Sequence, residues 1–185
     1  MEIEIIKSLQ AINSNFFDFF CKLVSHLGNY IGFILVFLLL FMLFNRKYSI
    51  YFGITYGISI LANYILKYVI NRPRPYIANS SIKNIMPGSG ASMPSGHTLS
   101  ATIIACFCVF AIIKKCKHKS VKIVSALLLT AFVACIMVSR MYLGQHYLSD
   151  TIVGFVEGII FSAIGIFLYT KNERRKKEIG NDNKQ

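Results

Sequence analysis

Acidic residues are scarce in this sequence: eight Asp and Glu stand against 20 Lys and Arg, for a formal net charge of +12. An excess of this size is typical of proteins that bind nucleic acid or an anionic membrane surface. A nucleic-acid-binding protein would carry a continuous basic face on a soluble fold. Here the basic residues form short clusters between apolar runs and near the C-terminus. We therefore expect no nucleic-acid partner, and we expect the clusters to orient a membrane protein.

Residues with the spacing of metal ligands are also missing. The five cysteines lie in or beside apolar segments, and we interpret them as small apolar residues. No carboxylate or His/Cys cluster would hold a metal, so we expect no metal and no other cofactor. The N-terminal segment carries Glu2 and Glu4 but neither a basic region nor a small-residue cleavage site. We therefore expect no cleaved signal peptide.

Apolar segments dominate the 185 residues: 55% of them are hydrophobic, and the mean hydropathy is +0.55. This is more apolar than an ordinary soluble domain, and the length allows one domain. Five segments are long enough, or nearly long enough, to cross a bilayer. They are residues 29–44, 48–70, 97–113, 123–138 and 147–169. The sequence therefore predicts five transmembrane helices.

The segment before the first span is amphipathic. Between Ile5 and Leu27, apolar residues recur every three or four positions and polar residues fill most of the other face, which is the period of a helix. It is too polar to span, so we predict a helix that lies in the membrane interface or caps the bundle. The prediction is thus an all-α integral membrane bundle, with an N-terminal amphipathic helix (1–28), a transmembrane domain that carries the candidate site (29–170) and a basic cytoplasmic tail (171–185).

The basic clusters predict the orientation of this bundle. They lie at 46–47, 114–122 and 171–177, and the positive-inside rule makes this side cytoplasmic. The N-terminus, the 71–95 loop and the 139–146 turn then face outside, and the C-terminus faces inside. Four basic residues on the outer side break the rule, namely Arg72, Arg74, Lys83 and Arg140. Residues that break a local rule are where function is expected.

His146 and Asp150 form a chemical pair in this outer region. They are four residues apart at the start of a predicted helix, so their side chains share a face. A carboxylate bonded to one imidazole nitrogen leaves the other nitrogen free to act as a nucleophile. Alternatively, Asp150 is a charge favoured by the helix N-terminus, but an Asp at the edge of an apolar span is costly without a partner. We therefore predict a nucleophilic His146 supported by Asp150.

Three basic side chains are expected near this pair. Lys67 and Arg74 occur in the pattern Lys67-x6-Arg74-Pro75, and Arg140 precedes His146 by six residues. Each arginine taken alone is as consistent with a contact to lipid headgroups as with a role in a phosphate site. Together, two guanidiniums and one ammonium suit the negative charge that a transferring phosphoryl group spreads over its oxygens. We predict a phosphate site at the outer face of the membrane.

The tetrapeptide Pro94-Ser95-Gly96-His97 opens the third predicted span. Proline is favoured in a first helical turn, and Gly96 lets the backbone approach a ligand closely. Free N–H groups of Ser95 and Gly96 would point at an anion. We predict that His97 protonates the leaving group as general acid. The alternative is a histidine that sits at the membrane interface without a catalytic role.

These three segments, between Lys67 and Asp150, resemble the signature motifs of the type 2 phosphatidic acid phosphatases, the PAP2 superfamily that also contains the vanadium haloperoxidases. The resemblance implies the helical core of that family and a metal-independent lipid phosphatase in the cell membrane. His146 would attack phosphorus and form a phosphohistidine, supported by Asp150, and His97 would protonate the leaving group. The residues that would bind the phosphoryl oxygens are Lys67, Arg74, Ser95, Gly96 and Arg140.

Several substrates and activities fit this resemblance. The candidate lipids are undecaprenyl diphosphate, phosphatidylglycerol phosphate and phosphatidic acid. Outer-face undecaprenyl diphosphate phosphatases are similar in size and opening segment, but they often carry Asp at the position of Gly96. The alternatives are a lipid phosphotransferase of the same superfamily and a non-catalytic lipid-binding or transport protein, because a fold alone does not establish activity. The compact chain indicates a bacterial protein, and we expect no further span before the amphipathic segment.

Glu157 and Asn63 are two further polar residues inside predicted spans. Glu157 lies seven residues after Asp150, and an intramembrane carboxylate either supports a site or bonds to a neighbouring helix. Asn63 lies one turn before Lys67 and either holds that lysine or bonds between helices. We favour an interhelical bond for both residues.

Overall fold

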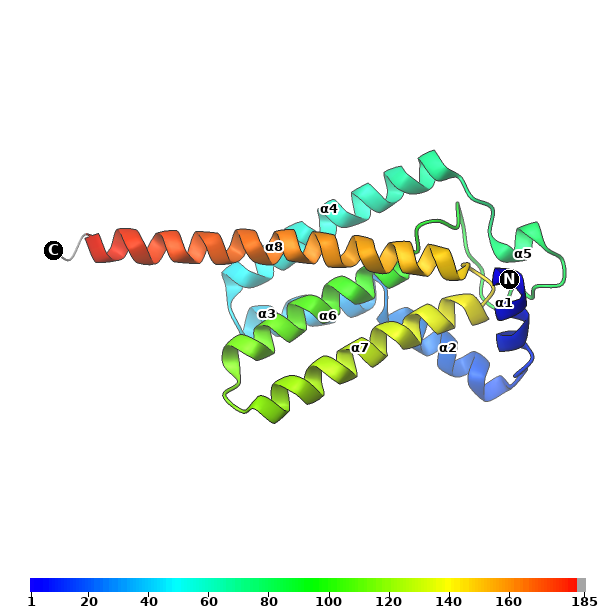
Figure 1. Ribbon diagram of the computed structural model, residues 1–185, viewed down its shortest axis with the longest axis horizontal. Coiled ribbons are helices and arrows are strands. Elements are labelled where there is room, and N and C mark those ends of the chain that lie inside the picture. Colours follow the sequence, from blue (N-terminus) through cyan, green and yellow to red (C-terminus); the bar gives the residue numbers. More distant parts are fainter. Residues whose placement is uncertain (183–185) are drawn as a thin grey trace.

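The computed structural model describes residues 1–182, and every regular element in that stretch is a helix (Figure 1). In order these are α1 (Glu2–Gln10), α2 (Asn15–Leu27), α3 (Tyr30–Leu43), α4 (Arg46–Ile70), α5 (Pro75–Ala78), α6 (Gly96–Lys115), α7 (Lys119–Tyr142) and α8 (Leu148–Asp182). The prediction of an all-α bundle is confirmed. The helix α8 continues through most of the predicted basic tail, whose last residues, 183–185, lie outside the described part.

Four of the described helices, α4, α6, α7 and α8, are each long and apolar enough to cross a membrane. The helices α2 and α3 meet this test only as a pair, bent by 51° at the break between them, and bring the number of spans to as many as five. Large apolar side chains such as Leu38, Leu127 and Leu128 are exposed along these helices, where a bilayer would cover them. The chain is a multi-pass membrane protein.

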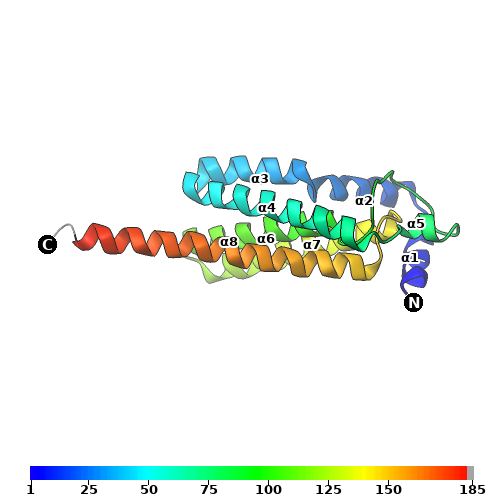
Figure 2. The ribbon, with the colours of Figure 1, turned by 90° about the horizontal axis from the view of Figure 1, so that it is seen from above.

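The N-terminal segment differs from the single helix predicted between Ile5 and Leu27. It forms two helices, because Asn13 adopts a left-handed backbone (φ 40°) and Ser14 an extended one. Asparagine tolerates the left-handed region, and the apolar period continues across the break, so the pattern alone did not reveal it. Figure 2 shows α2 and α3 in line along one edge of the bundle, with α6, α7 and α8 on the other side of α4.

The connection from α4 to α6 and the turn from α7 to α8 meet at one end of the bundle, at the right in Figure 1. The helix α4 ends where Asn71 takes a left-handed conformation (φ 45°), shortly before Pro73 and Pro75. The turn after α7 contains Gly144 (φ 77°), where a Cβ atom would overlap the backbone carbonyl of Lys83. The connection from α4 to α6 continues after α5 through the 79–95 loop. This end therefore gathers segments that are far apart in sequence.

The opposite half of the bundle is filled by aromatic side chains. Tyr48, Phe52 and Phe107 are fully buried in one cluster with Tyr169, and their ring centroids lie 4.9 to 5.3 Å apart in the contacting pairs. The Tyr48 hydroxyl donates to the Phe107 carbonyl at 2.8 Å, so its polar group is satisfied inside the apolar core. This half serves as a packed scaffold for the polar end.

Glycines on α8 allow it to lie close to its neighbours. A Cβ atom at Gly154 would overlap the backbone carbonyl of Ser95, and one at Gly158 would lie 2.6 Å from the Cβ of Thr102. Small residues at such crossings let membrane helices approach closely. The approach at Gly154 holds the start of α6 against the start of α8, where predicted site residues lie.

We predict that Gly154→Ala destabilises the protein by about 1–3 kcal/mol, because the backbone of Ser95 cannot yield to the new methyl group. The matched control is Gly57→Ala on α4, where an added Cβ meets nothing within 4 Å and the helix gains up to about 1 kcal/mol. Thermal unfolding in detergent measures both variants. Equal unfolding temperatures for the two variants would contradict this account of the packing.

Candidate active site

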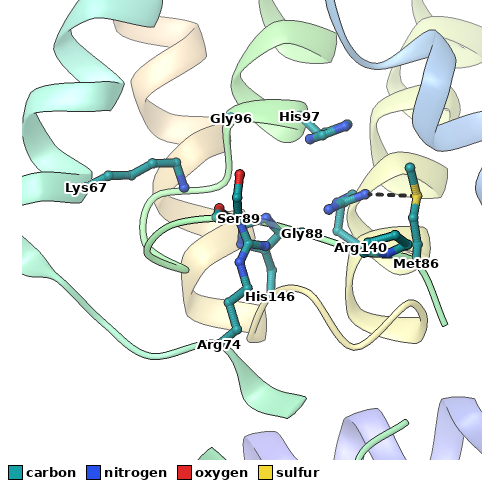
Figure 3. Close-up of a pocket in the computed structure, with 10 residues that line it drawn as sticks. Lys67, Arg74, Met86, Gly88, Ser89, Gly96, His97, Arg140 and His146 are labelled. Atoms are coloured by element: carbon teal, nitrogen blue, oxygen red, sulfur yellow. Dashed lines mark hydrogen bonds between the residues drawn. The ribbon is translucent and has the colours of Figure 1, made fainter. Parts of the chain in front are cut away.

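A cavity of about 550 Å³ opens at the polar end of the bundle. Its wall includes part of the 79–95 loop, residues 86–89. Predicted site residues also line it, namely Lys67, Arg74, Gly96, His97, Arg140 and His146. Figure 3 shows these side chains reaching the same space from α4, α6, α7 and the connecting loops. Ser95 and Asp150 were predicted as site residues too, and they lie behind this wall, fully buried.

The predicted pair of His146 and Asp150 is close but not hydrogen-bonded. Nδ1 of His146 lies 3.7 Å from Oδ2 of Asp150, which is longer than a hydrogen bond, and this buried Nδ1 has no other partner. The same Oδ2 accepts the Tyr147 backbone N–H at 2.8 Å and the Ser92 hydroxyl, and Oδ1 accepts Arg72 Nη1 at 2.7 Å. Asp150 thus caps the start of α8 and stands beside the histidine. Bonds between catalytic groups often tighten only when substrate is bound.

Arg140 is almost fully buried, at 3% exposure. Its Nη1 donates to the Ser25 hydroxyl at 2.6 Å, while its Nε has no partner. A buried guanidinium with an unused N–H is costly unless an anion completes its shell. Ser25 comes from α2, which the sequence did not connect with the site.

Arg74 is held mainly by carbonyl and amide oxygens. Its Nε donates to the Gly90 carbonyl at 3.0 Å, Nη2 to the Ser89 carbonyl at 2.5 Å and Nη1 to Oε1 of Gln145 at 2.9 Å. A Cβ atom at Gly88 would overlap that same Oε1, so the loop packs directly on this contact. Arg74 therefore fixes the 86–90 segment over the cavity and keeps part of its guanidinium for a ligand. Gln145 was not predicted, because an uncharged amide inside a turn carries no distinctive pattern.

Lys67 and the start of α6 complete the wall. The Lys67 ammonium donates to the carbonyls of Ala91 and Ser92 at 3.0 and 3.4 Å, which leaves a third donor. Ser95 is the N-cap of α6 and accepts from the Thr98 N–H, while its own N–H donates to the Asp150 carbonyl at 3.0 Å. The Ser95 N–H is therefore engaged. The expectation that it is free to bind an anion is wrong. Helix α6 begins at Gly96, so Pro94 precedes the first turn and is not part of it.

The polar pair inside the spans joins two helices, as favoured from the sequence. Asn63 on α4 donates through Nδ2 to Oε2 of Glu157 on α8 at 2.8 Å. The other carboxylate oxygen of Glu157 is buried without a partner. This contact ties the helix that carries Lys67 to the helix that carries Asp150.

The imidazole of His146 is neutral in this environment. Burial, reinforced by the positive charges of Arg140, Lys67 and Arg74 and opposed by Asp150, lowers its pKa to about 3. A neutral imidazole retains a lone pair for attack on an electrophile. The site thus combines a buried neutral imidazole with three cations around one cavity. Such a site can bind an anion of the size of phosphate and present it to a nucleophile.

The fold and the cavity define a helical membrane protein in which three basic side chains surround a cavity beside a buried histidine. The family model of the PAP2 superfamily matches residues 48–175. The chain belongs to the PAP2 superfamily, as the resemblance of its three motifs implied.

Two curated relatives are similar over part of their length. Phosphatidylglycerophosphatase B of Bacillus subtilis is 34% identical over 104 residues, which cover 54% of this chain and 47% of the relative. Dolichyldiphosphatase of Saccharomyces cerevisiae is 29% identical over 110 residues, 57% of this chain and 45% of the relative. The chain therefore spans about half the length of these curated relatives.

Two crystal structures share the fold over most of the chain. The first transmembrane PAP2 type phosphatidylglycerolphosphate phosphatase from Bacillus subtilis matches with a TM-score of 0.79 at 20% identity, over 92% of this chain and 85% of that one. Aquifex aeolicus LpxE matches with a TM-score of 0.73 at 25% identity, over 89% and 94%. The arrangement of the helices is therefore that of PAP2 membrane proteins.

The lowered pKa of His146 predicts a pH-dependent loss of stability. Between the folded pKa of about 3 and the ordinary value of 6.5, the unfolded chain binds a proton that the folded chain does not. The free energy of unfolding therefore falls as the pH drops below about 6.5, by about 2 kcal/mol at about pH 5. We expect the unfolding temperature to fall less between about pH 7.5 and about pH 5 in His146→Asn than in the wild type.

The control for this prediction is His118→Asn, because His118 is exposed before α7 at the opposite end of the bundle. Its unfolding temperature is expected to follow that of the wild type. The same pH dependence in the wild type and in His146→Asn would contradict the lowered pKa.

Proposed function

We propose that the protein is a metal-independent lipid phosphatase that works through a phosphohistidine. The observation that carries this proposal is the neutral, buried His146 in a cavity lined by Lys67, Arg74 and Arg140. Three positive charges would neutralise the phosphoryl oxygens of a bound substrate. The names of the relatives, which are phosphatases of lipid phosphates or diphosphates, support the same chemistry.

The reaction would run in two displacements. Because Nδ1 of His146 is the nitrogen beside Asp150, Nε2 would attack phosphorus, and the bond from phosphorus to the leaving oxygen would break. His97 would give its proton to that oxygen, so that an alcohol or a phosphate leaves. His97 would then take a proton from water, whose oxygen attacks phosphorus and breaks the N–P bond. Inorganic phosphate leaves, and both histidines return to their starting states.

A lipid is the substrate class that the surroundings of the cavity favour. A second hollow of about 300 Å³ shares Gly96 and His97 with the first and continues along Tyr30, Tyr56 and Ile60 of α3 and α4. These side chains face the membrane region, so a lipid would place its phosphate at His146 while its tails stay in hydrocarbon. The candidates are undecaprenyl diphosphate, phosphatidylglycerol phosphate and phosphatidic acid.

We propose that this cavity faces the outside of the cell membrane. The basic clusters at 46–47, 114–122 and 171–177 lie at the other end of the bundle, where α3 meets α4, α6 meets α7 and α8 ends (Figure 1). The positive-inside rule assigns that end to the cytoplasm. The bacterial origin stays a prediction.

The orientation is testable with single cysteines in a chain whose five native cysteines are replaced by alanine. Ser81 is exposed on the 79–95 loop, and Lys117 is exposed between α6 and α7, so each is replaced by cysteine in turn. We expect a membrane-impermeant thiol reagent to label the first in intact cells and the second only after permeabilisation. The reverse labelling would place the cavity in the cytoplasm.

The activity is testable by phosphate release from the three candidate lipids, with purified protein in detergent and EDTA. We predict that release survives EDTA and that His146→Ala lowers it by at least roughly a thousandfold, because the nucleophile is lost. The control is Lys83→Gln, which removes an exposed charge at the same end but outside the cavity. It should retain activity.

Each other outcome has a defined meaning. Absence of release from all three lipids by folded protein would overturn the hydrolase proposal. Release that requires a second lipid or sugar as acceptor would identify a phosphotransferase. Release that EDTA abolishes would contradict the metal-independent mechanism.

A further inference from the structure

Arg72 lies between two carboxylates that are far apart in the sequence, Glu2 and Asp150. Its Nη1 donates to Oδ1 of Asp150 at 2.7 Å, and its Nη2 donates to Oε2 of Glu2 on α1 at 2.9 Å. The side chain of Arg72 is 27% exposed and that of Asp150 is fully buried. The three groups form a continuous chain of charges from the N-terminal helix to the carboxylate behind His146.

Further contacts fix the orientation of this guanidinium. Its Nη1 also donates to the Ser149 hydroxyl at 2.7 Å, and its Cζ lies 3.8 Å from the ring centroid of Tyr147. The second oxygen of Glu2 accepts the Ser149 backbone N–H at 2.8 Å. Arg72 is therefore held by ion pairs along its edge and by an aromatic ring against its face.

Arg72 supplies the positive charge opposite Asp150, whose carboxylate also accepts from the Ser92 hydroxyl and the Tyr147 N–H. Among the lysines and arginines of residues 1–182, Arg72 forms the ion pair with Asp150. A fully buried carboxylate without a cation is strongly destabilised. Because Arg72 takes Oδ1, the other oxygen, Oδ2, is directed toward Tyr147 and His146. Arg72 does not line the cavity, so it would not touch a phosphate bound there.

We propose that Arg72 and Glu2 are positioning residues: Arg72 holds Asp150 in register with His146, and Glu2 holds Arg72. The proposal rests on the phosphatase function proposed above. It makes α1 a working part of the site, although Glu2 belongs to none of the three motifs. Substitution of either residue lowers the rate of the chemical step and leaves the binding of phosphate intact.

The matched control for Glu2 is Gln10, at the other end of α1. Gln10 also fixes α1 to the bundle, donating through Nε2 to the carbonyls of Lys83 and Tyr142, both at 2.8 Å, but it has no contact with the charge chain. A variant of Gln10 therefore reports on the docking of α1 alone. A variant of Glu2 reports on the charge chain as well.

The experiment measures kcat, KM and the inhibition constant of inorganic phosphate for Glu2→Gln, Arg72→Gln, the double variant and Gln10→Ala, each in the full chain. We expect Arg72→Gln and Glu2→Gln to lower kcat by roughly tenfold or more, as for a lost charge-assisted bond. KM and phosphate inhibition should stay within about twofold of wild type. The double variant should be no slower than Arg72→Gln, because Glu2 acts through Arg72. Arg72→Lys should recover part of the rate, and it takes the place of Arg72→Gln if that variant does not fold.

Three outcomes would overturn the inference. In the first, Glu2→Gln retains the wild-type kcat. In the second, Gln10→Ala loses as much as Glu2→Gln, which would assign the effect to helix docking. In the third, the effects of Glu2 and Arg72 multiply in the double variant. If the wild type releases no phosphate, the proposed function fails and this inference falls with it, whereas an active wild type with an unaffected Glu2→Gln overturns the inference alone.

Discussion

The polar end of this fold is governed by the repulsion among Lys67, Arg74 and Arg140, which face one cavity at the edge of a low-dielectric bundle. Carbonyls of the 89–92 segment hold the first two, and Ser25 holds the third. These neutral partners fix the positions of the charges without cancelling them. Three like charges around one cavity favour the binding of an anion such as phosphate, as the proposed function requires.

The rest of the molecule serves to keep these charges in place. The aromatic cluster around Tyr48 packs the far half of the bundle, and the glycine contact at Gly154 sets α8 against the start of α6. The bond between Asn63 and Glu157 joins α4 to α8. The site is thus built on helices whose relative positions are fixed by packing, which is the condition for electrostatic preorganisation. The loop over the cavity adds the contacts that depend on Arg74.

Much of the site was predictable because its charged residues have no inexpensive place in an apolar chain. A histidine four residues before an aspartate at a span boundary stands out against its surroundings, and so does an arginine such as Arg140 at the end that the positive-inside rule predicts to be outside. The unpredicted contributors are ordinary in sequence. Gln145 and Ser25 carry no charge, and Glu2 was considered only as evidence against a signal peptide. The break at Asn13 was hidden because the apolar period continues through it, and the engaged N–H of Ser95 depends on a tertiary contact.

If His146 is the nucleophile, phosphorus is transferred to its imidazole during each turnover, and a trapped intermediate would reveal this transfer. The protein would be mixed with a lipid labelled in its terminal phosphate, quenched within one turnover, and digested for peptide mapping. We expect label on the peptide that contains His146. This label should be stable in alkali and lost in acid, as expected for a phosphorus–nitrogen bond. Label on another residue, or full turnover with no labelled protein at any time, would contradict it.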